Sequence, residues 1–177
     1  GAGHARMLEY QDREYAELYV QRMKRVLEAE RAGDPSGDGG FSTTSETARF
    51  LALWMAFDDI VRVADLKCRA SRFARVRQEV KASAEDLVRI YDFFKPGVPE
   101  IAALLPRTWA RALVGWDRRR QQGGKTALAL PLKIGVHTIS GFLALRCLAS
   151  LKWLRKRGSR FAQEQAMIER WLAAVGQ

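Results

Sequence analysis

The feature that most constrains the fold is an uninterrupted apolar run of eight residues from Phe50 to Phe57. A helix formed by this run is apolar on every side, so we expect other parts of the protein to enclose it. The charged residues that follow are offset by four, three and four positions: Asp58, Arg62, Asp65 and Arg69. Side chains at these offsets share one face of a helix and can pair along it. The sequence therefore predicts a long buried helix with a charged stripe inside the packing or at its edge.

Two interpretations of this stripe stay open. In one, its carboxylates act as general acids or bases and its arginines bind an anionic ligand. In the other, the stripe is a structural ladder of ion pairs. The structural interpretation is favoured, because charge networks change packing and pKa values without being catalytic.

The length of 177 residues suits one folded domain spanning residues 1–177, and 47% hydrophobic content gives it enough apolar side chains for a core. Thirty Lys and Arg residues against twenty Asp and Glu residues leave a formal net charge of +10. Such a charge favours an acidic partner, which leaves nucleic acid, an anionic membrane surface and an acidic protein open.

The start of the chain, Gly1 to His4, has neither an initiator Met nor an apolar signal core. We expect the chain to be a fragment excised from a longer polypeptide. Cys68 and Cys147 stand in mostly apolar helical patterns, which predicts two buried, reduced thiols rather than a disulfide. The expected location is cytoplasmic.

Apolar residues recur at helical spacing through most of the chain, which predicts an all-α fold of about six to seven helices in an irregular bundle. The expected helices cover residues 5–32, 43–80, 87–94, 99–106, 109–116, 138–158 and 159–175. Thr43 and Glu46 have the spacing of a capping box, and Ser83 and Asp86 repeat a related start signal. The buried face of the fifth helix is expected at Trp109, Ala112, Leu113 and Trp116.

Three segments depart from the helical pattern. Residues 33–42 are rich in Gly, Asp and Ser, and residues 118–126 combine three arginines with two glycines, so both are expected to be mobile loops. Pro131 and Gly135 make residues 126–136 extended rather than helical.

No motif in the chain assembles a cofactor or metal site. Gly124-Lys125-Thr126 resembles the end of a phosphate-binding loop, but Arg119 occupies the position of a required glycine. His4 and His137 have no metal-binding residue at ligand spacing. We therefore expect no catalytic, cofactor-binding or metal-binding residues in this domain.

Residues 134–151 are apolar enough to raise the question of a membrane, but His137 and Arg146 weaken a spanning helix. A core or partner-facing helix is the favoured interpretation, with membrane and nucleic-acid binding ranked below it. The basic residues that end this segment form a candidate docking surface: Lys152, Arg155, Lys156 and Arg157.

Three stretches carry a resemblance to a known family: Glu46–Val80, Phe93–Ala102 and Phe161–Leu172. They resemble the C-terminal helical region of indolepyruvate oxidoreductase beta-subunit proteins, which belong to the 2-oxoacid:ferredoxin oxidoreductases. The similarity is most specific in Glu46–Val80, which includes Arg-Phe-Leu-Ala-Leu-Trp-Met-Ala-Phe-Asp-Asp.

The resemblance implies membership of an enzyme that oxidatively decarboxylates indolepyruvate or related aryl 2-oxoacids to aryl-acetyl-CoA and passes electrons to ferredoxin. It places thiamine diphosphate and iron–sulfur clusters in a partner subunit or elsewhere in the polypeptide. The chain itself is then expected to be a non-catalytic accessory domain that serves assembly. Its expected partners are the remaining domains of the oxidoreductase, the thiamine/iron–sulfur subunit and acidic ferredoxin. The alternative is an independent helical adaptor that binds an anionic membrane surface or nucleic acid.

Overall fold

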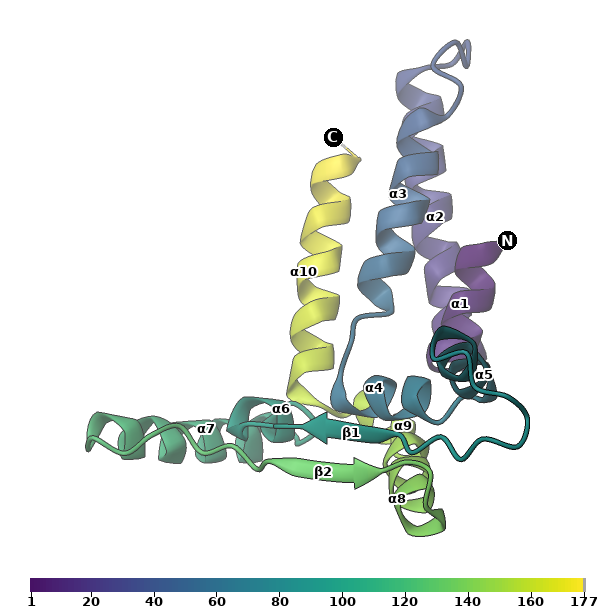
Figure 1. Ribbon diagram of the computed structural model, residues 1–177. Helices are drawn as coiled ribbons and strands as arrows, with labels where there is room; N and C mark the ends of the chain where they lie inside the picture. The colour runs from purple at the N-terminus through teal and green to yellow at the C-terminus, as the bar shows by residue number, and fades with distance from the viewer. Residues whose placement is uncertain (177) are drawn as a thin grey trace. The chain divides into compact units, whose positions relative to one another are not determined.

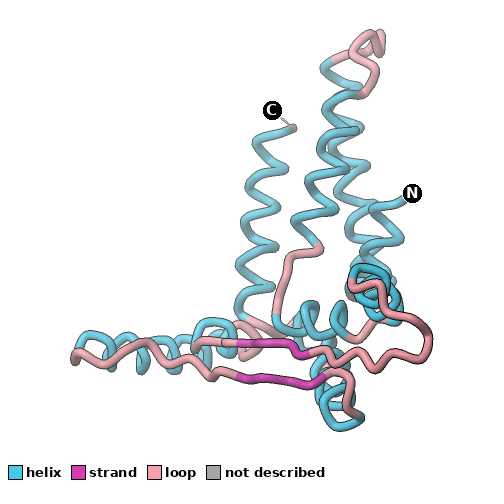
Figure 2. Tube along the Cα trace, viewed as in Figure 1, coloured by secondary structure: helices cyan, strands magenta, loops and turns pink. Residues whose placement is uncertain are grey.

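The computed structural model describes residues 1–176, which are mostly helical with one small two-stranded antiparallel sheet (Figures 1 and 2). The predicted helical fold class is confirmed. The chain divides into two compact units, each described separately below: unit 1 comprises Gly1–Phe57 with the chain from Ala162 onward, and unit 2 comprises Asp58–Phe161. The assignment of residues 1–177 to one accessory domain stays a prediction.

Unit 1 contains three N-terminal helices, α1 (Ala2–Tyr10), α2 (Arg13–Gly33) and α3 (Ser42–Met55), and most of α10 (Ser159–Val175). The prediction of one helix over residues 5–32 is wrong, because the chain leaves the helical conformation between α1 and α2. Asp12 is extended there, and its carboxylate accepts a 2.9 Å hydrogen bond from the Tyr15 backbone N–H. This side chain starts α2 anew, as an Asp at a helix N-terminus commonly does.

The core of unit 1 is a set of fully buried apolar and aromatic side chains: Met7, Tyr10, Tyr15, Leu51, Met55 and Ile168. The Tyr15 hydroxyl donates to the Met55 carbonyl at 2.9 Å and accepts from the Gln165 amide at 2.9 Å. A buried hydroxyl with both partners incurs little desolvation penalty. The apolar run from Phe50 thus supplies the core with Leu51 and Met55, while Phe50 itself is 47% exposed.

The start of α3 shows that the predicted capping box is wrong. Phe41, with a φ of 54°, precedes the helix, and the carboxylate of Glu30 on α2 accepts from the Thr43 and Thr44 backbone N–H groups at 2.9 and 2.8 Å. Hydrogen bonds from Thr44 first, and then from Thr43, hold the pKa of Glu30 below its ordinary value. The Glu30 carboxylate therefore accepts hydrogen bonds from the first turn of α3, a role that the sequence had assigned to a local capping box.

Unit 2 contains most of the shorter helices: α4 (Ile60–Lys67), α5 (Ala70–Glu79), α6 (Val98–Ala102), α7 (Arg107–Gln122), α8 (Ile139–Ser150) and α9 (Lys152–Arg155). The expected single helix over residues 43–80 is wrong, since α3, α4 and α5 divide that stretch. Asp59 is extended and caps α4 by accepting from the Arg62 backbone N–H at 2.6 Å. Periodicity alone does not reveal this interruption.

The sheet of unit 2 pairs β1 (Tyr91–Phe94) with β2 (Leu132–Gly135), with Tyr91 opposite Gly135 and Phe94 opposite Leu132. An extended segment within residues 126–136 is confirmed, but the helix expected over residues 87–94 is wrong. Aromatic residues fit a strand as well as a helix, and here the pairing with β2 decides. The predicted start signal closes a turn instead, in which Asp86 accepts from the Ser83 backbone N–H at 2.6 Å.

The core of unit 2 lies where α4, α8 and the end of β2 meet, and its buried members are Ala64, Cys68, Val136 and Leu145. Phe73 and Phe142 pack against it. Burial raises the pKa of the Cys68 thiol. Cys147, which was expected to be buried as well, is exposed. It lies two residues from Leu145 on α8, and two positions turn a helix by roughly 200°.

Helix α7 contradicts two predictions. It runs through Gln122, so the three consecutive arginines from Arg118 are helical rather than part of a loop. Its buried residues are Ala110 and Asp117, whereas Trp109 and Trp116, which were expected to face a core, are 71% and 45% exposed. The periodicity of large apolar residues therefore indicated the wrong face of this helix.

Candidate functional site

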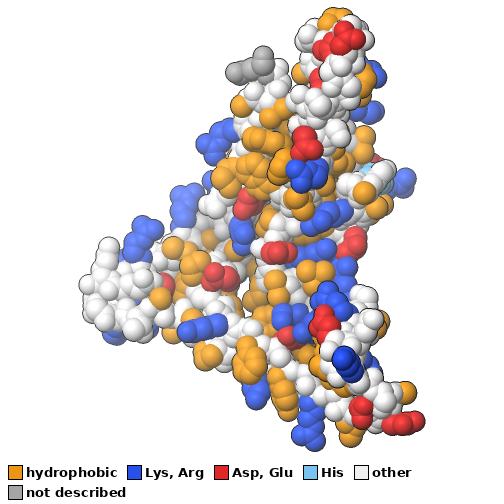
Figure 3. All heavy atoms as spheres, turned by 45° about the horizontal axis from the view of Figure 1, so that its top comes forward, with side chains coloured by type: hydrophobic (Ala, Val, Ile, Leu, Met, Phe, Trp, Pro, Cys, Tyr) orange, Lys and Arg blue, Asp and Glu red, His pale blue; other side chains and the backbone are white. Residues whose placement is uncertain are grey.

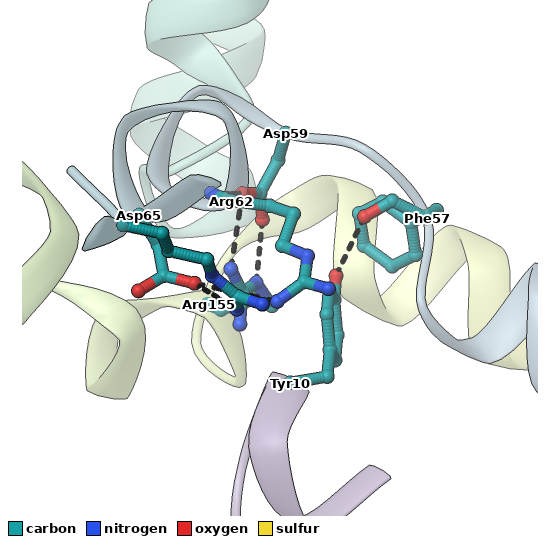
Figure 4. Close-up of polar contacts among 7 residues, drawn as sticks. Tyr10, Phe57, Asp59, Arg62, Asp65 and Arg155 are labelled. Carbon is teal, nitrogen blue, oxygen red and sulfur yellow. Dashed lines mark hydrogen bonds and ion pairs between the residues drawn. The ribbon is translucent and has the colours of Figure 1, made fainter. Parts of the chain in front are cut away.

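The predicted charged stripe is only partly assembled. Asp58 precedes α4 and is exposed, so it is not part of the stripe. The other three residues meet at one carboxylate. Asp65 Oδ2 lies 3.3 Å from Arg62 Nη1 (Figure 4) and 2.6 Å from Arg69 Nη2. The Asp65 and Arg69 side chains are 36% and 32% exposed. This is an ion-pair ladder with a water-facing side, and its structural role stays a prediction.

The most buried ion pair of unit 2 is one that the sequence analysis did not single out. Asp59 Oδ2 accepts from Arg155 Nε at 2.5 Å, and Asp59 Oδ1 accepts from Arg155 Nη2 at 3.1 Å (Figure 4). The two side chains are 6% and 3% exposed. The same carboxylate also caps α4, so one side chain links α4 to α9 across 96 residues of sequence. The available signal was an Asp just before a helix, the position of an N-cap.

A second buried carboxylate, Asp92 on β1, holds two cations. Arg72 of α5 donates to both of its oxygens, at 2.8 and 2.9 Å, and Lys67 Nζ lies 2.5 Å from Oδ1. The Asp92 side chain is 5% exposed. A bidentate arginine pair fixes the orientation of both groups. This cluster therefore joins the sheet to α4 and α5, and it uses groups that could otherwise bind an anion.

The predicted docking surface of Lys152, Arg155, Lys156 and Arg157 is wrong for Arg155. Arg155 points inward to Asp59, so it does not lie on a surface as expected. Lys152 and Arg157 are exposed, Lys156 is half-buried, and the Arg157 guanidinium lies 5.4 Å from the Trp153 ring centre. A buried arginine within a basic run cannot be recognised from charge alone, because its partner is distant in sequence.

Two hollows of unit 2 bear on a binding site. One, of about 470 Å³, is lined mainly by apolar side chains, including Ile90, Val136, Ile139 and Phe142, with His137 at its wall. The His137 Nδ1 atom lies 3.0 Å from the Ile90 carbonyl oxygen, so this nitrogen is already engaged. Within residues 1–176, no group of three or more His, Cys, Asp or Glu side chains is arranged to hold a metal ion.

The second hollow, of about 340 Å³, mixes aromatic and charged groups. Phe93 and Phe94 line it together with Asp58, Lys95 and Arg160. Asp59 also borders it, but its carboxylate is occupied by Arg155 and by the backbone of α4. A hollow of this size and mixed polarity is suited to a small polar ligand or to a protruding side chain of a partner.

The charge of the chain is divided unequally between the units. Unit 2 has twenty-two Lys and Arg residues against nine Asp and Glu residues, a formal net charge of +13, whereas unit 1 has eight against eleven, a net charge of −3. Figure 3 shows basic side chains interspersed with hydrophobic ones on the visible face. The entire positive excess of the chain thus resides in unit 2.

Fold and site together define a mostly helical, two-unit protein whose buried charges are organised as structural ion pairs. In the described part of the chain, no helix has the length and apolar character needed to span a membrane. The family model described as "Family of unknown function (DUF6537)" matches residues 1–177, so the chain belongs to this family. No curated protein and no solved structure matched the chain.

Proposed function

We propose that this chain is a non-catalytic accessory domain that serves the assembly of an indolepyruvate, or aryl 2-oxoacid, ferredoxin oxidoreductase. The observation that carries the proposal is the resemblance of Glu46–Val80 to the helical region of the beta subunit. In this proposal the parent enzyme forms aryl-acetyl-CoA and reduces ferredoxin. The thiamine diphosphate and iron–sulfur clusters belong to the partner subunit or another part of the polypeptide.

The arrangement of side chains in unit 2 supports an assembly role. The carboxylates of Asp59 and Asp92 are engaged by arginines and a lysine of the same unit, which leaves them as structural anchors. At the same time, large apolar side chains remain exposed: Phe93 by 73%, Trp109 by 71% and Ile139 by 82%. Aromatic side chains are enriched at protein interfaces.

Co-expression with the thiamine- and iron–sulfur-containing subunit tests the proposal. We expect the two to co-purify at a fixed ratio, and we expect aryl 2-oxoacid-dependent ferredoxin reduction to fall when the chain is omitted. The matched control is the same subunit expressed with an unrelated helical protein of similar charge. The proposal fails if the chain does not bind and enzyme activity is the same without it.

The independent adaptor is the second candidate, and the net charge of +13 in unit 2 favours it. Such an adaptor would bind phosphatidylserine-rich vesicles or duplex DNA with an affinity that falls steeply as salt rises. Binding to either at physiological salt, without binding to the oxidoreductase subunit, would support the adaptor over the assembly domain.

A further inference from the structure

We infer that α7 is the docking element of this domain, and that it binds an acidic, partly apolar face of the thiamine- and iron–sulfur-containing subunit. The inference rests on the proposed function and assigns the contact to one helix. The docking residues, called here the α7 surface, are Arg107, Trp109, Arg111, Trp116, Arg118 and Arg119.

The α7 surface is exposed because little of the helix is used within unit 2. Ala110 and Asp117 are its buried residues, seven positions apart on one narrow side. Its main neighbouring element is the short helix α6, and Figure 1 shows α7 extending beyond the end of the sheet. A helix of sixteen residues that buries so small a side leaves most of its circumference for a partner.

The residues on the two flanks of α7 are those that dominate protein interfaces. Trp109 and Trp116 are seven residues apart and share one flank, where the Arg120 guanidinium lies 5.3 Å from the Trp116 ring centre. Arg107 and Arg111 are four residues apart and share the other flank, both exposed. Tryptophan and arginine are the residue types most enriched among binding hot spots.

Exposed apolar residues also occur in the segment that follows α7 and on the neighbouring helix α6. Leu128 and Leu130, in the segment that follows the helix, are 46% and 56% exposed, and Ile101 of α6 is 41% exposed. The segment is held in place beside α6, because the Leu130 backbone N–H donates to the Pro96 carbonyl at 3.0 Å. Exposed apolar side chains on ordered segments are suited to a stable interface more than to a brief electrostatic encounter.

Charge complementarity sets the chemistry of the partner. Helix α7 has five arginines and one acidic residue, Asp117, which is 4% exposed and lies near Arg120 Nε at 3.7 Å. The exposed charged groups of α7 are therefore all basic, and they require acidic groups opposite them. A membrane-surface helix needs a broad apolar face, whereas the two tryptophans of α7 form one narrow flank. Binding of duplex DNA would use the arginine flank and leave the tryptophans unburied.

The test measures binding of the 177-residue chain to the purified thiamine- and iron–sulfur-containing subunit by surface plasmon resonance at low and high salt. One variant replaces Trp109 and Trp116 with Ala, and another replaces Arg107, Arg111 and Arg118 with Gln. The matched control replaces Arg75, Lys81 and Arg89, exposed basic residues elsewhere in unit 2, with Gln. Circular dichroism checks that all variants keep the helical content of the wild type.

We expect the tryptophan variant to lower affinity at least 30-fold through faster dissociation. The arginine variant should slow association about tenfold at low salt and by much less at high salt. The control should change both rates less than twofold. Wild-type binding with unchanged kinetics in both α7 variants overturns the inference but leaves the proposed function standing. Absence of wild-type binding overturns the inference, and it overturns the proposed function as well if enzyme activity is the same without the chain. Loss of vesicle or duplex DNA binding in the arginine variant, with subunit binding retained, assigns α7 to those ligands instead.

Discussion

Replacing Asp59 with Ala should destabilise unit 2 more than replacing a charged residue on its surface, because Asp59 has two roles. Its carboxylate neutralises Arg155, whose side chain is 3% exposed, and it caps α4 through the Arg62 backbone N–H. The substitution leaves the arginine buried without its partner and the first turn of α4 without an acceptor. Both consequences fall on elements of unit 2.

The size of the loss follows from these two roles. Removing one partner of a buried ion pair costs about 3–5 kcal/mol, and losing an N-cap side chain costs about 1 kcal/mol. We expect Asp59→Ala to lower the free energy of unfolding by about 5 kcal/mol. Asp59→Asn should lose less, about 3 kcal/mol, because the amide oxygen can still cap α4. Arg155→Met should lose about 3 kcal/mol, since the remaining carboxylate keeps its bond to the backbone.

The assay is urea unfolding followed by circular dichroism, combined with hydrogen-exchange mass spectrometry of the peptides that cover α4 and α9. Exchange reports these helices separately from unit 1, where we expect no change. The control is Arg75→Ala, because the pair that Arg75 forms with Glu79 is 69% and 64% exposed and should contribute less than about 1 kcal/mol. The double variant Asp59→Ala/Arg155→Met should lose less than the sum of the single losses. Losses below about 1 kcal/mol in both single variants would refute the reasoning.

Three further predictions concern other titratable groups. Asp92→Asn should destabilise unit 2 by about 3 kcal/mol in urea unfolding, because Arg72 loses a buried bidentate partner. A loss of unfolding free energy no larger than that of Arg75→Ala would count against this prediction. Cys147 should react with a thiol reagent at the rate of an exposed cysteine. Cys68 should react at least tenfold more slowly, because burial raises the pKa of its thiol. Equal rates of labelling by mass spectrometry would contradict this prediction. Partial burial raises the pKa of Glu169, but hydrogen bonds from two arginines outweigh it and hold this pKa below its ordinary value of 4.5. The ionised Glu169 carboxylate therefore stabilises the folded protein above pH 4.5, and this stabilisation is lost as the pH falls through the lowered pKa of the folded state. Thermal unfolding from pH 6 to pH 3 should therefore show the wild type losing its advantage over Glu169→Gln, and a constant difference would refute the linkage.

The sequence predicted the helical class and several boundaries because those depend on local chemistry. The last helix begins at Ser159 as expected, and Thr138 caps α8 by accepting from the Gly141 backbone N–H at 3.1 Å. The extended segment before α8 followed from Pro131 and Gly135, which disfavour a helix. In each case the deciding groups lie within a few residues of one another.

The errors share a different physical origin, which is that the deciding partner lies far away in sequence. Glu30 caps α3 from thirteen residues upstream, and the strand Tyr91–Phe94 exists because β2 pairs with it about forty residues later. Asp59 meets Arg155 across 96 residues. The local run of basic residues predicted a docking surface that included this arginine, whereas the tertiary structure buries it.

The cations of unit 2 fall into two groups, those paired with buried carboxylates and those that make its surface basic. Arg72, Arg155 and Lys67 are bound to buried carboxylates, which uses two of the nine acidic residues of this unit. The four exposed arginines of α7 make no ion pair within residues 1–176, and the partly buried Arg120 contacts Asp117. Since buried pairs are screened by salt much less than exposed charges, the fold should tolerate salt that weakens docking. Stability and association can then be separated experimentally: salt that abolishes the rate advantage of wild-type α7 over its arginine variant should leave the Asp59–Arg155 contribution to unfolding nearly unchanged.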